Sequence, residues 1–93
     1  MGTVGNAAGK KPIRLSSHAQ GYLRRRGFSV PEVEQAIRTG PWEAAERGKL
    51  QCRKDFPFEQ IWNGHRYSIK QVRPIFVEEA DEIVVVTVYT YYF

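Results

Sequence analysis

The sequence has few of the cysteines and none of the long apolar segments that stabilise many small proteins or anchor them in membranes. One of its 93 residues is a cysteine, Cys52, which excludes an intramolecular disulfide and a zinc site built of cysteines alone. The longest apolar run, Ile83 to Val86, is far too short to cross a bilayer. Residues 1–11 have no apolar core of the kind a signal peptide needs. These absences predict a reduced, soluble, cytoplasmic domain without a membrane partner.

Acidic residues are missing from the first third of the chain. Residues 1–31 hold six Lys and Arg and no Asp or Glu, whereas four acids crowd into residues 78–82. The net charge is +4. A strongly basic end favours nucleic acid, an acidic protein or an anionic surface as its partner, and it is also typical of an ordinary solvated face.

Two helices are expected in the N-terminal half. Residues 1–12 lack any periodicity and predict a flexible basic tail. A first helix from about Ser16 to Arg26 has a serine cap and a stop at Gly27, and its wheel places His18 and Arg25 on one shoulder. A capping box at Ser29–Glu32 starts a second helix, which Gly40-Pro41 ends.

The periodicity then changes to that of strands. Residues 49–56 and 58–62 are expected to form two strands, with Cys52 as a buried small hydrophobe. Asn63-Gly64 predicts a tight hairpin turn. The return strand, residues 65–73, places Arg66 and Lys70 on its polar face.

The last strand, residues 82–93, is the most β-prone segment. It is apolar on both faces, and strict alternation puts Val85, Thr87 and Tyr89 on the same face. The prediction for residues 13–93 is one α+β domain, in which two N-terminal helices pack on one face of a roughly four-stranded, mostly antiparallel sheet.

No strong catalytic motif is present. The chain lacks a phosphate-binding glycine loop, a Gly-x-Ser-x-Gly elbow and a His-Glu-x-x-His pair. Its histidines, His18 and His65, and Cys52 are too scattered to argue for a metal. Neither a metal nor a cofactor is therefore expected.

What remains is His18 among basic residues on a helix, facing a sheet with Lys70 and Tyr89. Metal-independent RNA cleavage needs a base for the 2′-OH proton, an acid for the leaving 5′-oxygen, and cations for the charge on the phosphorane. His, Tyr and Lys can supply the first two, and Arg the third. Each of these residues also has a plain structural explanation as a cap, a solvated helix end or a packing residue.

Several short motifs resemble one family. They are Ser17-His18-Ala19, Arg26-Gly27-Phe28-Ser29, and the block from Trp62-Asn63-Gly64 to the C-terminal Val85–Phe93. Together they resemble the domain-of-unknown-function family 4258 over roughly residues 13–93. That family has been grouped with the barnase, EndoU, colicin and RelE-like ribonuclease fold, whose members include many toxins of bacterial toxin–antitoxin pairs. The resemblance aligns His18, Arg26, Thr87 and Tyr89 with family positions, and the chain departs from the pattern at Tyr22.

The leading hypothesis is a metal-independent, RelE-like endoribonuclease toxin, with RNA and an acidic antitoxin as its partners. Its catalytic candidates are His18, Lys70 and Tyr89, and its RNA phosphate-binding candidates are Arg25, Arg26, Arg53, Arg66 and Thr87. Two alternatives stay open. One is a non-catalytic module that binds nucleic acid or protein. The other is an assembly protein whose C-terminal strand pairs with a second copy.

Overall fold

The structure is a computed structural model that describes residues 11–93. The predicted tail lies outside this range except for its last two residues, which contact the sheet. The Lys11 ammonium forms an ion pair with Glu78 at 2.8 Å, and the Pro12 carbonyl accepts from the Ile83 amide at 2.9 Å. The parallel strand that follows is thus attached to the sheet from its first residue.

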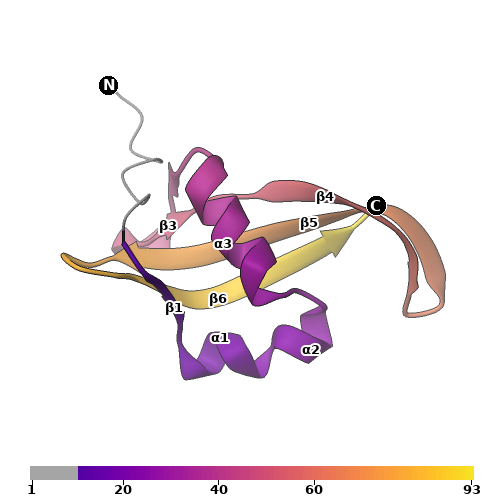
Figure 1. Cartoon of the computed structure of the whole chain (residues 1–93), viewed down its shortest axis with the longest axis horizontal. Helices are drawn as coiled ribbons and strands as arrows, with labels where there is room; N and C mark the ends of the chain where they lie inside the picture. Colours follow the sequence, from indigo (N-terminus) through magenta and orange to yellow (C-terminus); the bar gives the residue numbers. More distant parts are fainter. Residues whose placement is uncertain (1–10) are drawn as a thin grey trace.

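The described chain is mostly β-structure, with its helices near the N-terminus (Figure 1). In chain order the elements are β1 (Ile13–Leu15), α1 (Ser17–Gly21), α2 (Leu23–Arg26), α3 (Val30–Thr39), β2 (Glu43–Ala44), the 3₁₀ turn η2 (Glu46–Gly48), β3 (Leu50–Gln51), β4 (Lys54–Trp62), β5 (His65–Glu78) and β6 (Ile83–Tyr92).

The strands of residues 11–93 form one six-stranded mixed sheet. Its order is β1-β6-β5-β3-β2, and β4 also pairs with β5, beside β3. All pairs are antiparallel except β1 with β6. The predicted arrangement of two helices on a four-stranded sheet is therefore wrong. The short strands β1, β2 and β3 have two or three residues each, too few for a periodic signal.

The first predicted helix is broken into two. The Ser16 side chain caps α1 as expected, accepting from the Ala19 amide at 3.1 Å. The helix stops at Gly21, because glycine costs about 1 kcal/mol inside a helix. At Tyr22 the amide bonds to Ala19 instead, and α2 then runs to Gly27, whose φ is 75°. The break turns the basic segment along the edge of the sheet (Figure 1).

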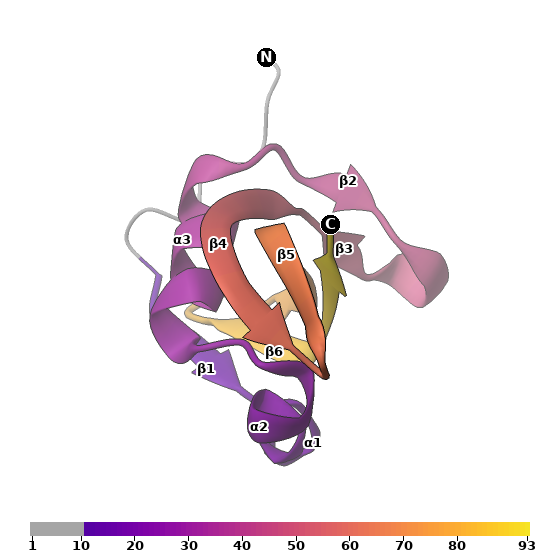
Figure 2. The same ribbon diagram turned by 90° about the vertical axis from the view of Figure 1, so that its right-hand side faces the viewer.

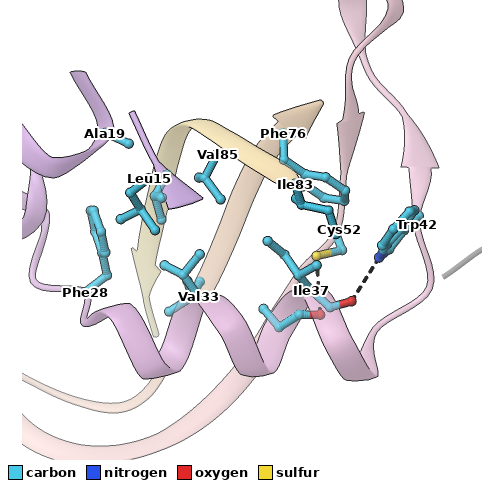
Figure 3. Close-up of a cluster of buried hydrophobic side chains, with 13 residues drawn as sticks. Leu15, Ala19, Phe28, Val33, Ile37, Trp42, Cys52, Phe76, Ile83 and Val85 are labelled. Atoms are coloured by element: carbon cyan, nitrogen blue, oxygen red, sulfur yellow. Dashed lines mark hydrogen bonds between the residues drawn. The ribbon is translucent and has the colours of Figure 1, made fainter. Parts of the chain in front are cut away.

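Helix α3 matches its prediction and covers the sheet. The capping box of Ser29 and Glu32 is formed in both directions, and the helix ends at Gly40. Its apolar face packs against β5 and contributes Val33 and Ile37 to the core (Figure 3). The Cys52 thiol lies in this core and donates to the Ala36 carbonyl at 3.3 Å. Burial raises the pKa of that thiol to about 12, so it is inert near neutral pH.

A slip in register changes which side chains of β6 face the core. Phe76 pairs with Val85, but Ile75 pairs with Thr87, so one extra residue sits in β6 between them. Val85 and Val88 are both fully buried, which moves Thr87 to the opposite face. The strict alternation predicted for this strand is therefore wrong from Thr87 onward. The bulge therefore places Thr87 and Tyr89 on the sheet face opposite the core.

The hairpin of β4 and β5 extends beyond the end of β6 and bends there (Figure 1), and Figure 2 views the molecule from this end. Its turn is the predicted Asn63-Gly64, both with positive φ, at 50° and 84°. An aromatic cluster closes this end of the molecule. The Trp62 ring stacks on Tyr92 with centroids 5.0 Å apart, and Tyr67 lies 5.6 Å from the same ring.

Candidate functional site

The site begins where β1 stops covering the edge of β6. β1 ends opposite Val85. Farther along β6, side chains of the α1–α2 segment and its cap donate hydrogen bonds to the backbone carbonyls at this edge. Ser16 Oγ donates to the Val86 carbonyl at 3.3 Å, and Arg26 Nη1 donates to the Val88 carbonyl at 2.8 Å. The segment α1–α2 is thereby held along the β6 edge, where His18 is exposed and Arg26 is half-buried.

His18, Tyr22 and Arg26 form a stack along this segment. The exposed His18 ring meets the Tyr22 ring edge-on, with centroids 5.0 Å apart and planes at 69°. The guanidinium carbon of Arg26 lies 3.9 Å from the centre of the Tyr22 ring, and that of Arg25 lies 5.6 Å from it. Tyr22 therefore joins the predicted histidine to both predicted arginines.

Arg26 continues the stack onto β6. Its Nη1 also donates to the Thr87 hydroxyl at 3.4 Å, and its guanidinium carbon lies 5.0 Å from the centre of the Tyr89 ring. His18, Arg26, Thr87 and Tyr89, which are far apart in sequence, thus share one contiguous patch. We call His18, Tyr22, Arg25, Arg26, Thr87 and Tyr89 the edge cluster.

Arg26 is hydrogen-bonded to β6 through both its side chain and its backbone carbonyl. Its own carbonyl accepts from the Thr90 hydroxyl at 2.5 Å and from the Tyr92 hydroxyl at 2.9 Å. Within residues 11–93, none of its hydrogen bonds uses Nε or Nη2. The guanidinium is therefore fixed in place while part of its donor fork stays available to an anion.

An open groove adjoins the edge cluster on the sheet face away from α3. Its volume is about 610 Å³, and Thr87 and Tyr89 form the wall that it shares with the cluster. The rest of its lining is mainly polar, with a small apolar part: Glu46, Arg47, Lys49, Gln51 and Arg73, then Ala45, Ile75 and Val86. Arg73 is fixed by Gln51 Oε1, which accepts from Nε at 3.1 Å and from Nη2 at 2.7 Å.

The basic residues of cluster and groove are not neutralised by neighbours. Among residues 11–93, no ion pair involves Arg25, Arg26, Arg47, Lys49 or Arg73. The acidic turn between β5 and β6 pairs instead with the N-terminal strand, where the Arg14 guanidinium lies 3.0 Å from the Glu82 carboxylate. The pKa of Glu82 is lowered by its hydrogen bond to Arg14. The positive charge therefore gathers at cluster and groove.

Lys70 does not join the cluster. It lies on the core face of β5, with its side chain 10% exposed, and its ammonium is 2.8 Å from a Glu32 oxygen and 2.9 Å from the Gly27 carbonyl. The prediction that Lys70 lies on an open polar face of this strand is wrong, because α3 and its capping residue cover that face. Lys70 holds the start of α3 to the sheet and is not proposed as a catalytic residue.

Arg53 and Arg66 also lie apart from the edge cluster. Arg53 is paired with Glu43 of β2 at 3.6 Å, and Arg66 is paired with Glu59 across the β4–β5 hairpin at 3.1 Å. Neither lines the groove. The sequence missed Tyr22 as a site residue and the groove cations Arg47, Lys49 and Arg73, because only the strand pairing shows which face they share.

Comparison with protein-family models, with curated proteins and with solved structures finds no match for this chain. The resemblance to family 4258 therefore stays a prediction. Within residues 11–93, no three His, Cys, Asp or Glu side chains gather closely enough to hold a metal ion. No helix in that range is long and apolar enough to cross a membrane.

Proposed function

We propose that the chain is a metal-independent endoribonuclease whose active site is the edge cluster. One observation carries this proposal: Tyr22 and Arg26 link the exposed His18 to Thr87 and Tyr89 of β6 through direct contacts. The two contacts of Tyr22 keep the His18 ring within about 9 Å of the Arg26 guanidinium, a gap that one hydrogen-bonded phosphodiester group can span.

The roles follow from the chemistry of each side chain. His18 is exposed and would take the proton from the 2′-OH, so that the 2′-oxygen attacks the adjacent phosphorus. Arg26 would bind the phosphate through the donors not used by the protein and stabilise the charge on the phosphorane. Tyr89, 42% exposed, stands beside the guanidinium and would protonate the leaving 5′-oxygen.

The biological setting is proposed from the resemblance. A ribonuclease of this kind would act in the bacterial cytoplasm as a toxin, restrained by an antitoxin. An acidic segment of the antitoxin would cover the positive charge of the edge cluster, since complementary charge speeds and directs such association.

The test is RNA cleavage by the purified full chain in excess chelator. Wild type should produce 2′,3′-cyclic phosphate ends, and His18→Ala should lose at least about 100-fold in rate, the usual contribution of a general base. His65→Ala is the matched control, because that exposed histidine lies at the hairpin tip and should cleave as wild type does. Equal rates for both variants would overturn the role of His18. RNA that wild type binds without cleaving would identify a binding module instead.

A further inference from the structure

The groove beside the edge cluster is not needed to hold the cleaved phosphodiester, yet it has the size of a ligand site and a surplus of cations. Its volume of about 610 Å³ falls in the range of small-molecule sites, about 300–1,000 Å³. Its cations outnumber its acids, with Arg47, Lys49 and Arg73 against Glu46. The groove therefore suits an anionic ligand larger than a lone phosphate.

Arg73 is the fixed element of the groove. It lies opposite Tyr89 in the ladder of β5 and β6, so both side chains rise from the same face. Its Nε and Nη2 are bonded to Gln51, which orients the guanidinium plane. Within the described residues its Nη1 has no hydrogen bond, and it remains available to a ligand.

The η2 turn supplies the opposite rim at a conformational cost. Arg47 has φ 59° and ψ 41°, the left-handed region that asparagine or glycine adopts far more readily than arginine. The chain between β2 and β3 lies on the side of β5 away from α3 (Figure 2). Arg47 of this turn adds a cation to the groove, at a position where the backbone favours a smaller residue. Lys49 follows from the same turn.

We propose that this groove is a second RNA subsite, which takes the unpaired nucleotide next to the cleaved bond. Its phosphate lies among Arg73, Lys49 and Arg47, and its base packs on Tyr89 and on the apolar floor of Ile75 and Val86. The inference rests on the proposed function, since Tyr89 and Thr87 belong to both sites and the RNA runs from one to the other. The substrate is single-stranded, because bases in a duplex are already stacked and cannot reach a tyrosine face.

The experiment measures binding separately from cleavage. The probe is a fluorescent six-nucleotide RNA with 2′-O-methyl groups, which cannot be cleaved, and its Kd is read by anisotropy over a salt series. Arg47→Gly removes one cation while suiting the local φ, and Lys49→Ala removes a second. Lys54→Ala is the matched control, because its ammonium lies over the Phe56 ring on β4, outside the groove lining.

Each groove variant should raise Kd at least about threefold, and the double variant should flatten the salt dependence by about 1.4 in log–log slope, as expected for two lost phosphate contacts on a single strand. Lys54→Ala should bind as wild type does. Groove variants that bind like wild type would overturn the subsite, and equal weakening on a duplex of the same sequence would overturn its preference for single strands.

The two proposals fail in different ways. Groove-dependent binding of the probe, with no cleavage of ordinary RNA by wild type, would overturn the ribonuclease and leave the subsite standing. Cleavage that depends on His18, with unaltered binding by the groove variants, would do the reverse. A wild-type chain that binds no RNA would overturn both.

Discussion

Gly27 carries the tightest steric constraint next to the edge cluster. Its φ is 75°, and a Cβ at this position would overlap the Tyr92 hydroxyl and lie 2.8 Å from Trp62 Cη2. The left-handed backbone costs an alanine about 1–2 kcal/mol. Forcing an extra methyl into packed rings costs about 1–3 kcal/mol. Gly27→Ala should therefore lower the free energy of unfolding by about 3 kcal/mol.

The two costs can be separated with matched variants. Gly48 has nearly the same φ, 74°, but a Cβ there meets nothing within 4 Å, so Gly48→Ala measures the backbone cost alone. Tyr92→Phe removes the hydroxyl that donates to the Arg26 carbonyl and should cost about 1 kcal/mol. In the Gly27→Ala/Tyr92→Phe double variant the nearest overlapping atom is gone, although Trp62 remains.

The assay is urea unfolding followed by tryptophan fluorescence. The double variant should lose about 1 kcal/mol less free energy of unfolding than the two single variants lose together. A coupling of this size is expected only for residues in contact. Gly48→Ala should lose about 1–2 kcal/mol and no more. Single effects of Gly27→Ala and Tyr92→Phe that add to within about 0.5 kcal/mol would refute the proposed overlap, as would equal losses for Gly27→Ala and Gly48→Ala.

Two further predictions concern buried groups. Burial raises the pKa of the Cys52 thiol from 9.0 to about 12, so the unfolded chain loses this proton first as the pH rises. The stability conferred by the buried thiol is present below pH 9 and is lost between pH 9 and 12, by up to about 1.4 kcal/mol per pH unit. Cys52→Ala should lack that component in denaturant unfolding, and identical alkaline slopes would contradict this. Lys70→Met leaves the Glu32 carboxylate without its partner and should cost about 2–3 kcal/mol, discounted for partial exposure. Adding Glu32→Gln should recover part of that loss in the same assay, and no recovery would mean that the ion pair is not the cause.

Local signals in the sequence predicted much of the chain. The capping box of α3, the Asn63-Gly64 turn and the strand that became β6 are all confirmed, because each depends on residues close together. The parallel pairing of Ile13–Leu15 with Ile83–Val85 joins segments about 70 residues apart, and three residues have no readable period. Long-range pairing of short strands leaves no trace in a single sequence.

The site was predicted only in part for the same reason. His18, Arg25, Arg26, Thr87 and Tyr89 lie close together, but Thr87 and Tyr89 do so only because the bulge in β6 turns them away from the predicted face. Strand alternation correctly predicts which face of β5 carries Lys70, but α3 lies over that face. Alternation tells which residues share a face, whereas the fold decides which face is open.

The measurement that tests the central claim most directly is a double-mutant cycle in kcat/KM for RNA cleavage. It compares wild type with His18→Ala, Arg26→Lys and the double variant, all in excess chelator. If His18 and Arg26 act as one unit on one phosphodiester, each single change removes most of the activity and the double variant loses little more than the worse single one. Losses in the two single variants that simply multiply in the double variant, or undiminished cleavage by either one, would contradict the assignment of the edge cluster as the active site.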